Sequence, residues 1–481
     1  MKYLFLETIF NSPHLETSTE IALHFKSKGN KIFFSWIGYD LPWSDWQISY
    51  TKKILGASIK KKVYLIEKIL KENKIQLVEL KKEEQISLSK IKKWAKRFKG
   101  NNSDLKKFTY QKQHLGLGVS SSIISNLHQS KFDTKKHRNL IIKSLISSAI
   151  IYERSLYLIK KTKPKYIVTF NNRFATSLPI VLAAKKCNVK VLRHERGSNF
   201  DKYEIFEKDI HDLSYRSDNV KFYWNKEKNI KKKEKIAKKY FFNRRNGIPL
   251  DWDMKKNYSS FQSSGNVPYK KKKYRIVFFT ASEDEHESTK FQLTNLLWSS
   301  QEIALKKLIQ SLKCLKDYEL FIRVHPTSEK RKSLKDQRKW TKFNNGSNIH
   351  VIPHNSQINS YELLDSSDLA VTYGGNIAIE AVYWRKKVIS LRNGIFSKNN
   401  FIFEPKSYQQ LKKYISSLKF LQNLDHSKKA LPFAYYFMVF GKKFRYFNCK
   451  SFDNCFYKGI QISHLSSLMI ELKKYKKILN R

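Results

Sequence analysis

Short apolar segments alternate with amphipathic stretches along this chain, and this alternation restricts its fold more than any other feature. Residues 2–8 (KYLFLET) and 31–37 (KIFFSWI) predict strands on either side of a helix at 16–28, which Gly29 ends. Strand–helix–strand units spaced about 30 residues apart indicate a parallel sheet, because parallel strands need a crossover connection, usually a helix.

The alternation returns twice along the chain. Residues 165–170 and 189–194 predict strands around a helix at 175–187, after a mostly helical, lysine-rich region at 52–163. A second series supplies five further strands. These lie at 274–280, 318–324, 348–352, 369–373 and 388–391, with helices predicted at 296–315, 360–366 and 376–385.

A change in composition separates the two series. Residues 246–273 hold Gly247, Pro249, Pro268, a Ser-rich stretch and a run of four lysines, which is typical of a linker. The 481 residues are too many for one ordinary domain and suit two. We therefore predict an α/β protein with two Rossmann-like domains that face a cleft, and a helical insertion in the N-terminal half. The predicted parts are 1–250, a linker at 251–273, 274–430, and a helical segment at 431–481 that packs back on the N-terminal domain.

The chain is strongly basic, with 94 Lys and Arg against 41 Asp and Glu and a net charge of +53. Such a charge attracts polyanions: nucleic acid, anionic lipid or phosphorylated substrates. Lys, Asn, Ile, Phe and Tyr, all residues with AT-rich codons, are abundant together, so the base composition of the genome explains the lysines equally well.

No apolar segment reaches the ~18–20 residues that a membrane-spanning helix needs. The best candidate, 144–159, is interrupted by Glu153 and Arg154, and Glu7 interrupts the first apolar run, which argues against a signal peptide. We therefore expect a cytoplasmic protein, held peripherally at the inner face of the cytoplasmic membrane by its basic surface.

The four cysteines are expected to be free and reduced, as in a cytoplasmic protein. Cys449 and Cys455 are six positions apart, but no second pair completes a zinc site. No bound metal is therefore expected.

Polar residues follow the predicted strands of the first half, where ligands of parallel α/β sheets bind. His14 and Glu16 follow the first strand, and a carboxylate or imidazole there can act as general base on an acceptor hydroxyl. The alternative for Glu16 is a favourable charge at a helix N-terminus. Further polar pairs follow the strands at 165–170 and 189–194, and they indicate a polar cleft floor for the acceptor or, alternatively, surface ion pairs. These are Asn172 with Arg173, and Glu195 with Arg196.

In the second half, Ser282 and Glu283 follow the strand 274–280, where small residues before a helix can offer N–H groups to a phosphate. A solvated acidic turn is the alternative. Arg323, His325 and Pro326 follow the next strand. The imidazole can donate to a phosphate oxygen, or it can be a satisfied turn histidine.

A small-residue turn joins the strand 369–373 to a helix, so that a phosphate could approach its backbone. The turn and first helical turn hold Thr372, Gly374, Gly375, Asn376 and Glu380. The chain contains neither GxGxxG nor GxxxxGK[ST], which argues against nicotinamide chemistry and against a P-loop NTPase.

Six short motifs occur in an order that resembles a known family. They are SPHLET (12–17), FNNR (170–173), HERG (194–197), FFTASEDE (278–285), RVHP (323–326) and the stretch 360–391. Together they resemble bacterial surface-polysaccharide glycosyltransferases of the GT-B fold, which act in capsule and lipopolysaccharide biosynthesis. The His–Pro motif is similar to that of β-Kdo transferases and bacterial sialyltransferases.

The resemblance implies a metal-independent glycosyltransferase that moves a sugar from a nucleotide-sugar, with CMP-linked sugars as candidates, to a lipid-linked glycan. Residues 1–250 would then bind the acceptor and 274–430 the donor. His325 and the turn 372–376 would hold the donor phosphates, Glu380 would contact the ribose, and Glu16 would be a candidate base. Similar enzymes often carry Gly-Ser or Ser-Thr where this chain has Gly374-Gly375-Asn376, which puts hydroxyl contacts to phosphate in doubt.

Three rival functions are compatible with parts of the pattern. A polyol-phosphate transferase of the teichoic-acid type has a similar fold. A nucleic-acid-binding protein is favoured by charge alone, but the basic residues are spread out and no RNA or DNA module is recognisable, so no nucleic-acid partner is expected. A sugar-nucleotide epimerase shares the architecture but is least favoured, because its usual acidic pairs are not identifiable.

Overall fold

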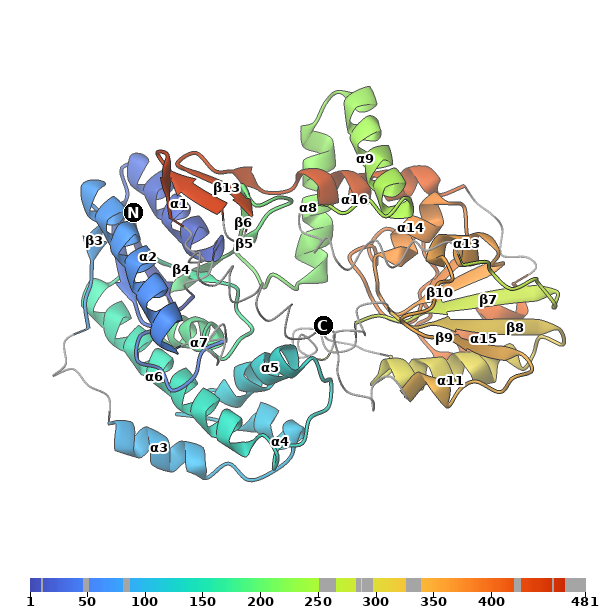
Figure 1. Ribbon diagram of the computed structural model, residues 1–481, viewed down its shortest axis with the longest axis horizontal. Helices are drawn as coiled ribbons and strands as arrows, with labels where there is room; N and C mark the ends of the chain where they lie inside the picture. Colours follow the sequence, from blue (N-terminus) through green and yellow to red (C-terminus); the bar gives the residue numbers. More distant parts are fainter. Residues whose placement is uncertain are drawn as a thin grey trace. The chain divides into compact units, whose positions relative to one another are not determined.

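The computed structural model describes residues 1–9, 12–45, 52–80, 87–250, 265–282, 287, 297–325, 339–418, 425–451 and 454–462. The chain forms two compact units. Unit 1 comprises Met1–Asn126, Lys131–Ile210 and Gly441–Arg481, and unit 2 comprises Leu127–Ser130 and His211–Phe440. Each unit is built around its own sheet (Figure 1).

Unit 1 contains a seven-stranded sheet of order β12-β6-β5-β4-β1-β2-β3. The five strands from β5 to β3 are parallel, whereas β6 and β12 are antiparallel to their neighbours. Strand β1 is buried from its second residue onward, as expected of a parallel strand with both faces covered. The strands are β1 (Lys2–Glu7), β2 (Lys31–Trp36), β3 (Gln76–Leu77), β4 (Tyr166–Phe170), β5 (Lys190–Arg196), β6 (Lys202–Phe206) and β12 (Lys442–Lys443).

The helices of unit 1 include the predicted insertion, which lies between β2 and β4. They are α1 (His14–Ser27), α2 (Lys52–Glu72), α3 (Leu88–Lys96), α4 (Asn102–Lys107), α5 (Leu115–Leu127), α6 (Arg138–Thr162) and α7 (Leu178–Lys186). Phe5 and Phe34 of the sheet share one core with Ile21 of α1 and Ile66 of α2.

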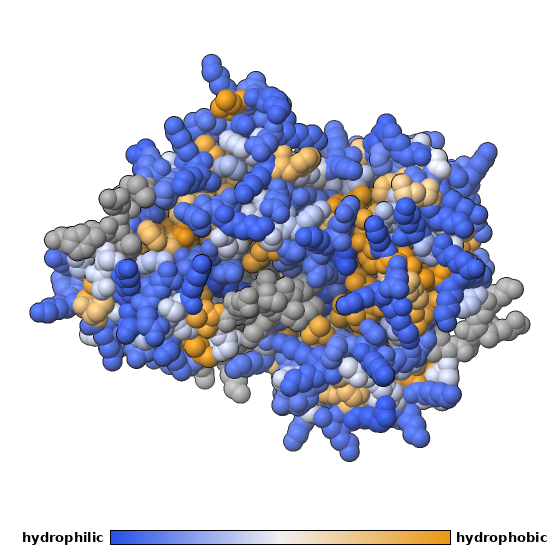
Figure 2. All heavy atoms as spheres, turned by 180° about the vertical axis from the view of Figure 1, so that it is seen from behind, coloured by the Kyte–Doolittle hydropathy of each residue, from blue (hydrophilic) through white to orange (hydrophobic). Residues whose placement is uncertain are grey.

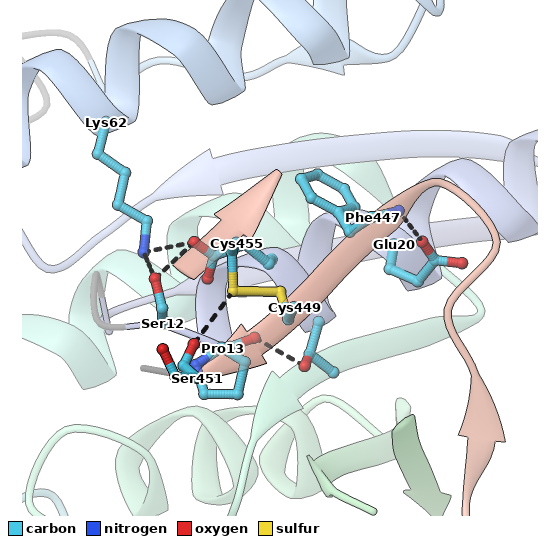
Figure 3. Close-up of a disulfide and its surroundings, with 10 residues drawn as sticks. Ser12, Pro13, Glu20, Lys62, Phe447, Cys449, Ser451 and Cys455 are labelled. Atoms are coloured by element: carbon cyan, nitrogen blue, oxygen red, sulfur yellow. Dashed lines mark hydrogen bonds and ion pairs between the residues drawn. A yellow bond between two sulfur atoms is a disulfide. The ribbon is translucent and has the colours of Figure 1, made fainter. Parts of the chain in front are cut away.

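The end of the described chain returns to unit 1 as strands. β13 (Phe447–Ser451), β14 (Asn454–Tyr457) and β15 (Ile460–Gln461) form a small antiparallel sheet. The buried Glu20 carboxylate of α1 accepts backbone N–H groups of Arg445 (2.7 Å), Tyr446 (2.9 Å) and Phe447 (3.2 Å), which fixes this segment on α1 (Figure 3). The sequence predicted a helical segment over 431–481; α16 (Ser427–Val439) is helical in its first part, whereas the described residues from Lys442 onward form strands.

The prediction of free cysteines was wrong for Cys449 and Cys455, which form a disulfide (Figure 3). The two residues are opposite one another in the antiparallel pair β13–β14, with Cα atoms 4.0 Å apart. Disulfides are rare in cytosolic proteins, so the cysteines no longer support the predicted cytoplasmic location. Cys187 and Cys314 are free.

Unit 2 contains a five-stranded, all-parallel sheet of order β11-β10-β7-β8-β9. Alternate residues of β7 enter different cores: Ile276 and Phe278 pack with α11 and α15, whereas Val277 and Phe279 pack with α9, α14 and α16. The strands are β7 (Tyr274–Phe279), β8 (Tyr318–Arg323), β9 (Ile349–Ile352), β10 (Leu369–Thr372) and β11 (Val388–Ser390). The helices are α8 (Leu213–Lys226), α9 (Ile230–Arg245), α11 (Gln301–Leu312), α13 (Ser360–Asp365), α14 (Ile377–Tyr383), α15 (Tyr408–Ser416) and α16 (Ser427–Val439).

The predicted fold class, α/β with two Rossmann-like sheets, is confirmed. The units divide the chain at 210/211 and 440/441, whereas the sequence suggested 250 and 430. The difference arises because Val220 of α8 and Phe241 of α9 share the core of unit 2 with Tyr436 of α16. The linker prediction for 251–273 falls outside the described residues up to 264. Among the described helices, none is both long and apolar enough to cross a bilayer.

Candidate functional site

Unit 1 buries an ion pair at the start of α1, directly after β1. Glu16 has no exposed side-chain surface, and its Oε1 accepts a hydrogen bond from Ser12 Oγ at 2.6 Å. Lys62 Nζ of α2 donates to Ser12 Oγ at 2.7 Å and lies 2.8 Å from Glu16 Oε1 (Figure 3 shows Lys62 and Ser12). Burial lowers the pKa of Lys62, and the negative charge of Glu16 opposes this. Glu16, the predicted base, is therefore bound to Ser12 in the turn before α1 and to Lys62 of α2.

A second carboxylate lies close to Lys62. Glu7, the last residue of β1, is buried, and its Oε1 accepts the backbone N–H groups of Thr8 and Ile9, each at 2.9 Å. Burial raises the pKa of Glu7 to about 7, although these hydrogen bonds and the charge of Lys62 favour the ionised form. One ammonium group thus serves two buried carboxyl groups.

Replacement of Glu7 by glutamine is expected to change how stability depends on pH. A carboxyl whose pKa is raised on folding binds more protons in the folded state, so it makes the protein less stable as pH rises from the unfolded pKa to the folded one. Between about pH 5 and pH 8, Glu7→Gln should gain about 1–3 kcal/mol in unfolding free energy relative to the native chain. Urea denaturation at both pH values measures this, and a constant difference would contradict it.

His14 lies at the same edge of the sheet and retains some exposure. Its side chain is 12% exposed, its ring centroid lies 4.2 Å from that of Phe170, and its Nδ1 is 3.9 Å from Glu195 Oε1. Burial lowers the pKa of His14 well below its ordinary value, and the positive potential of His194, Arg196 and Lys62 adds to this. His14 is therefore a neutral imidazole at neutral pH and can accept a proton.

The Glu195 carboxylate is held by its neighbours. It accepts hydrogen bonds from Asn171 Nδ2 at 2.9 Å and from the backbone N–H of Arg196 at 3.1 Å. Burial raises the pKa of Glu195, and these hydrogen bonds and the nearby Arg196 and Arg173 oppose the rise. Since β5, β4 and β1 are adjacent in the sheet, their carboxyl ends bring His14 and Glu195 together.

The other residues predicted for the cleft floor make separate contacts. Arg173 Nη1 donates to Ser125 Oγ at 3.1 Å on α5, and its guanidinium lies 4.1 Å from the Phe174 ring centroid. Asn172 is buried, and its backbone N–H donates to Asn171 Oδ1 at 2.7 Å. Arg196 stacks on Phe200 at 4.9 Å. The structure therefore joins Glu195 to His14 and directs Arg173 toward α5.

Unit 2 carries a buried cation at the carboxyl end of β8. Arg323 is 2% exposed, and it donates to Ser360 Oγ at 3.2 Å and to the carbonyl of Pro353 at 2.5 Å. Burial lowers the pKa of Arg323 to about 10. Both of these acceptors are neutral, so an anion beside Arg323 would compensate its charge. Two residues on, the backbone N–H of His325 donates to Thr280 Oγ1 at 2.7 Å.

The turn after β10 is shaped by backbone contacts. Gly374 has φ of +76°, and an added Cβ would lie 3.0 Å from the carbonyl of Asn393. Its N–H donates to Ser390 Oγ at 3.2 Å, and Thr372 Oγ1 donates to the same hydroxyl at 3.4 Å. Among the described residues, a Cβ on Gly375 would meet only the Ile377 side chain, at 3.9 Å. Asn376 precedes α14, and its side chain does not cap the helix.

Glu380 of α14 is buried among donors from other helices. It accepts hydrogen bonds from Tyr240 (3.3 Å) and Tyr361 (2.5 Å), and Arg244 Nε lies 3.4 Å from Oε1. Burial and the Glu380 charge raise the pKa of Tyr361 well above its usual value. A ribose bound here would share the Glu380 carboxylate with three protein groups. The predicted contact between Glu380 and the ribose stays a prediction. Ser282 is buried, whereas Glu283 and Pro326 lie outside the described residues.

Lys62 and Glu7 were not predicted as site residues. Lys62 occupies a buried stripe of α2 with Ile66 and Ile69, at helical spacing. A lysine at an apolar position of an amphipathic helix is a detectable signal, but the sequence does not show which carboxylate it meets. Within the described ranges, no group of three or more His, Cys, Asp or Glu side chains could hold a metal ion.

Comparison with known proteins identifies no family. No family model and no curated protein matches the chain. Among solved structures it is similar to the β-Kdo 2,4 transferase KpsC of Thermosulfurimonas dismutans, at 12% identity over 53% of this chain and 79% of that one, with a TM-score of 0.37. It is also similar to the UDP-GlcNAc 2-epimerase of Methanocaldococcus jannaschii, at 12% identity over 88% of this chain and 94% of that one, with a TM-score of 0.28. A glycosyltransferase of Rickettsia africae matches at 12% identity over 99% of this chain and 98% of that one, with a TM-score of 0.27. These values do not choose between transferase and epimerase.

Proposed function

We propose that this protein is a GT-B glycosyltransferase that moves a sugar from a nucleotide-sugar to a lipid-linked surface polysaccharide of the capsule or lipopolysaccharide type. The observation that carries the proposal is a division of chemistry between two Rossmann-like sheets. Unit 1 has a neutral imidazole beside a carboxylate at its carboxyl edge, and unit 2 has a buried guanidinium held by neutral oxygens. These are a proton acceptor and an anion-binding group. We assign the acceptor to unit 1 and the donor to unit 2.

In this mechanism His14 takes the proton of the acceptor hydroxyl, and Glu195 stabilises the imidazolium that forms. The acceptor oxygen then forms a bond to the anomeric carbon while the bond from that carbon to the donor phosphate breaks. The leaving phosphate gains negative charge, and we assign its stabilisation to Arg323 and His325 of unit 2. His14 is preferred to Glu16 as base because a base must reach the acceptor hydroxyl, and Glu16 is fully buried.

His325→Ala is expected to weaken nucleotide binding by about 1–3 kcal/mol, because a charge-assisted hydrogen bond to phosphate would be lost. Titration calorimetry with CMP, UDP, GDP and ADP identifies the nucleotide and measures the change. The matched control is His350→Ala, which removes an imidazole from β9 of the same sheet, where it packs on Phe321. Equal affinities of the His325 variant and the native chain for every nucleotide would contradict the assignment.

The transfer itself is tested with the nucleotide-sugar that binds. Incubation with a lipid-linked acceptor should release nucleotide only when the acceptor is present. Conversion of a UDP-sugar to its epimer without any acceptor would replace this proposal by the epimerase alternative.

A further inference from the structure

Helices α8 and α9 form a hairpin of unit 2 with a concentration of positive charge. Residues 221–239 hold nine lysines and two glutamates. The inner side of the hairpin is fixed in the core of unit 2, where Val220, Ala237 and Phe241 pack with α16. In Figure 1 both helices lie beside α16, and the loop that connects them lies away from the sheet of the unit. The hairpin is therefore a folded element with one face left to solvent.

The outer face of α9 is a stripe of lysines. Lys231, Lys235 and Lys238 follow one another at helical spacing and are exposed, whereas Ala237 and Phe241 are buried. Lys232 and Lys239 flank the stripe and are exposed as well. These five lysines form a positively charged surface about two and a half turns long.

The acidic side chains of the hairpin do not cancel this charge. Glu227 lies 2.6 Å from Lys232, and Glu234 lies 3.6 Å from Lys238 on the next turn. Asp218 of α8 is paired with Lys398 at 3.5 Å. With two glutamates against nine lysines, the hairpin keeps a large positive charge.

Apolar side chains are exposed on the same hairpin. Phe222, one turn before the end of α8, is 59% exposed, and Ile230, the first residue of α9, is 62% exposed. Phe242 in the last turn of α9 is 59% exposed. Figure 2 shows apolar atoms among hydrophilic ones at the end of the hairpin. Single exposed apolar residues are common on protein surfaces. Large exposed apolar side chains next to a row of lysines, however, are typical of helices that lie in the membrane interface.

We propose that the α8–α9 hairpin binds the surface of an anionic lipid bilayer. The lysines of α9 contact the lipid headgroups, and Phe222 and Ile230 enter the boundary between headgroups and acyl chains. An aliphatic Ile230 favours lipid over nucleic acid, because a phosphate backbone offers it no apolar environment. The inference rests on the proposed function in one respect only: membrane binding would bring the enzyme to a lipid-linked acceptor.

The test measures sedimentation of the full chain with phosphatidylcholine vesicles, with and without phosphatidylglycerol, in the absence of nucleotide and acceptor. Each lysine near an anionic surface contributes about a fivefold increase in partitioning, so Lys231→Gln/Lys235→Gln/Lys239→Gln should lower binding about 100-fold at low salt. The matched control is Lys90→Gln/Lys92→Gln/Lys93→Gln, on exposed positions of the lysine-rich helix α3, which should change binding less than about threefold.

A second variant tests the apolar contribution. Phe222→Ser/Ile230→Ser should lower the binding that persists at about 0.5 M salt, where charge is largely screened. Equal losses in the α9 and α3 variants would overturn the proposal, because the charge would then act without a defined surface. RNA binding of the same variants is measured as well. If the α9 variant lost RNA binding and kept its vesicle binding, the hairpin would be a nucleic-acid-binding element instead. Nucleotide affinity, measured in parallel, should stay unchanged in all variants, so failure of the proposed function is distinguishable from failure of the hairpin.

Discussion

Replacement of Lys62 by methionine is expected to lower the free energy of unfolding by about 3–5 kcal/mol. Lys62 is the cation of a buried cluster: it lies 2.8 Å from Glu16 and its charge acts on Glu7. Methionine fills a similar volume, so the loss measures the carboxylates left without a counter-charge rather than a cavity. Urea denaturation at neutral pH gives the value.

The double variant Lys62→Met/Glu16→Gln separates charge from packing. It should recover part of the loss, because residue 16 then carries no unpaired charge and Ser12 can still donate to the amide oxygen, whereas Glu7 keeps its buried carboxyl. The exposed pair Lys306–Glu302 of α11, at 3.5 Å, is the control, and Lys306→Met should cost less than about 0.5 kcal/mol. A cost for Lys62→Met as small as that of Lys306→Met would show that solvent screens the cluster.

The parallel strands could be predicted because both of their faces are buried. The apolar runs 274–280 and 318–324 became β7 (Tyr274–Phe279) and β8 (Tyr318–Arg323), with differences of one residue at their ends. A strand covered on both sides is a continuous apolar run, and this signal is local in the sequence.

Features that depend on distant contacts were not predicted. The residues after Gly441 return to unit 1 because Glu20, more than 400 positions earlier, binds three of their backbone N–H groups. The assignment of α8 and α9 to unit 2 rests on packing against α16, about 200 positions later. No local pattern contains this information. The disulfide is a local feature by contrast, since its cysteines are six positions apart, but it forms only because β13 and β14 pair in one register.

The candidate site was predicted in part for the same reason. The rule that ligands bind at the carboxyl ends of parallel strands selected His14 and Glu195, and adjacent strands bring them to 3.9 Å. The rule also selected Glu16 and Glu380, but it does not predict which side chains of other helices pack against them. Lys62 approaches Glu16 from α2, and Tyr240, Tyr361 and Arg244 approach Glu380.

His14→Ala is expected to lower turnover about 10²–10⁴-fold, with a much smaller change in nucleotide affinity, because the general base would be lost while unit 2 is untouched. Glu16→Gln is the comparison, since it keeps the hydrogen-bonding shape but removes the charge beside Lys62. It should lower stability and leave turnover nearly intact.

Because the pKa of His14 lies well below its ordinary value, native turnover should stay level through neutral pH and fall only in acid, as His14 becomes protonated. Steady-state rates of both variants across pH measure these effects. A Glu16→Gln enzyme that loses turnover while His14→Ala retains it would make Glu16 the base, as the sequence first suggested. Near-normal rates in both variants would indicate a retaining reaction, in which the leaving phosphate itself accepts the proton.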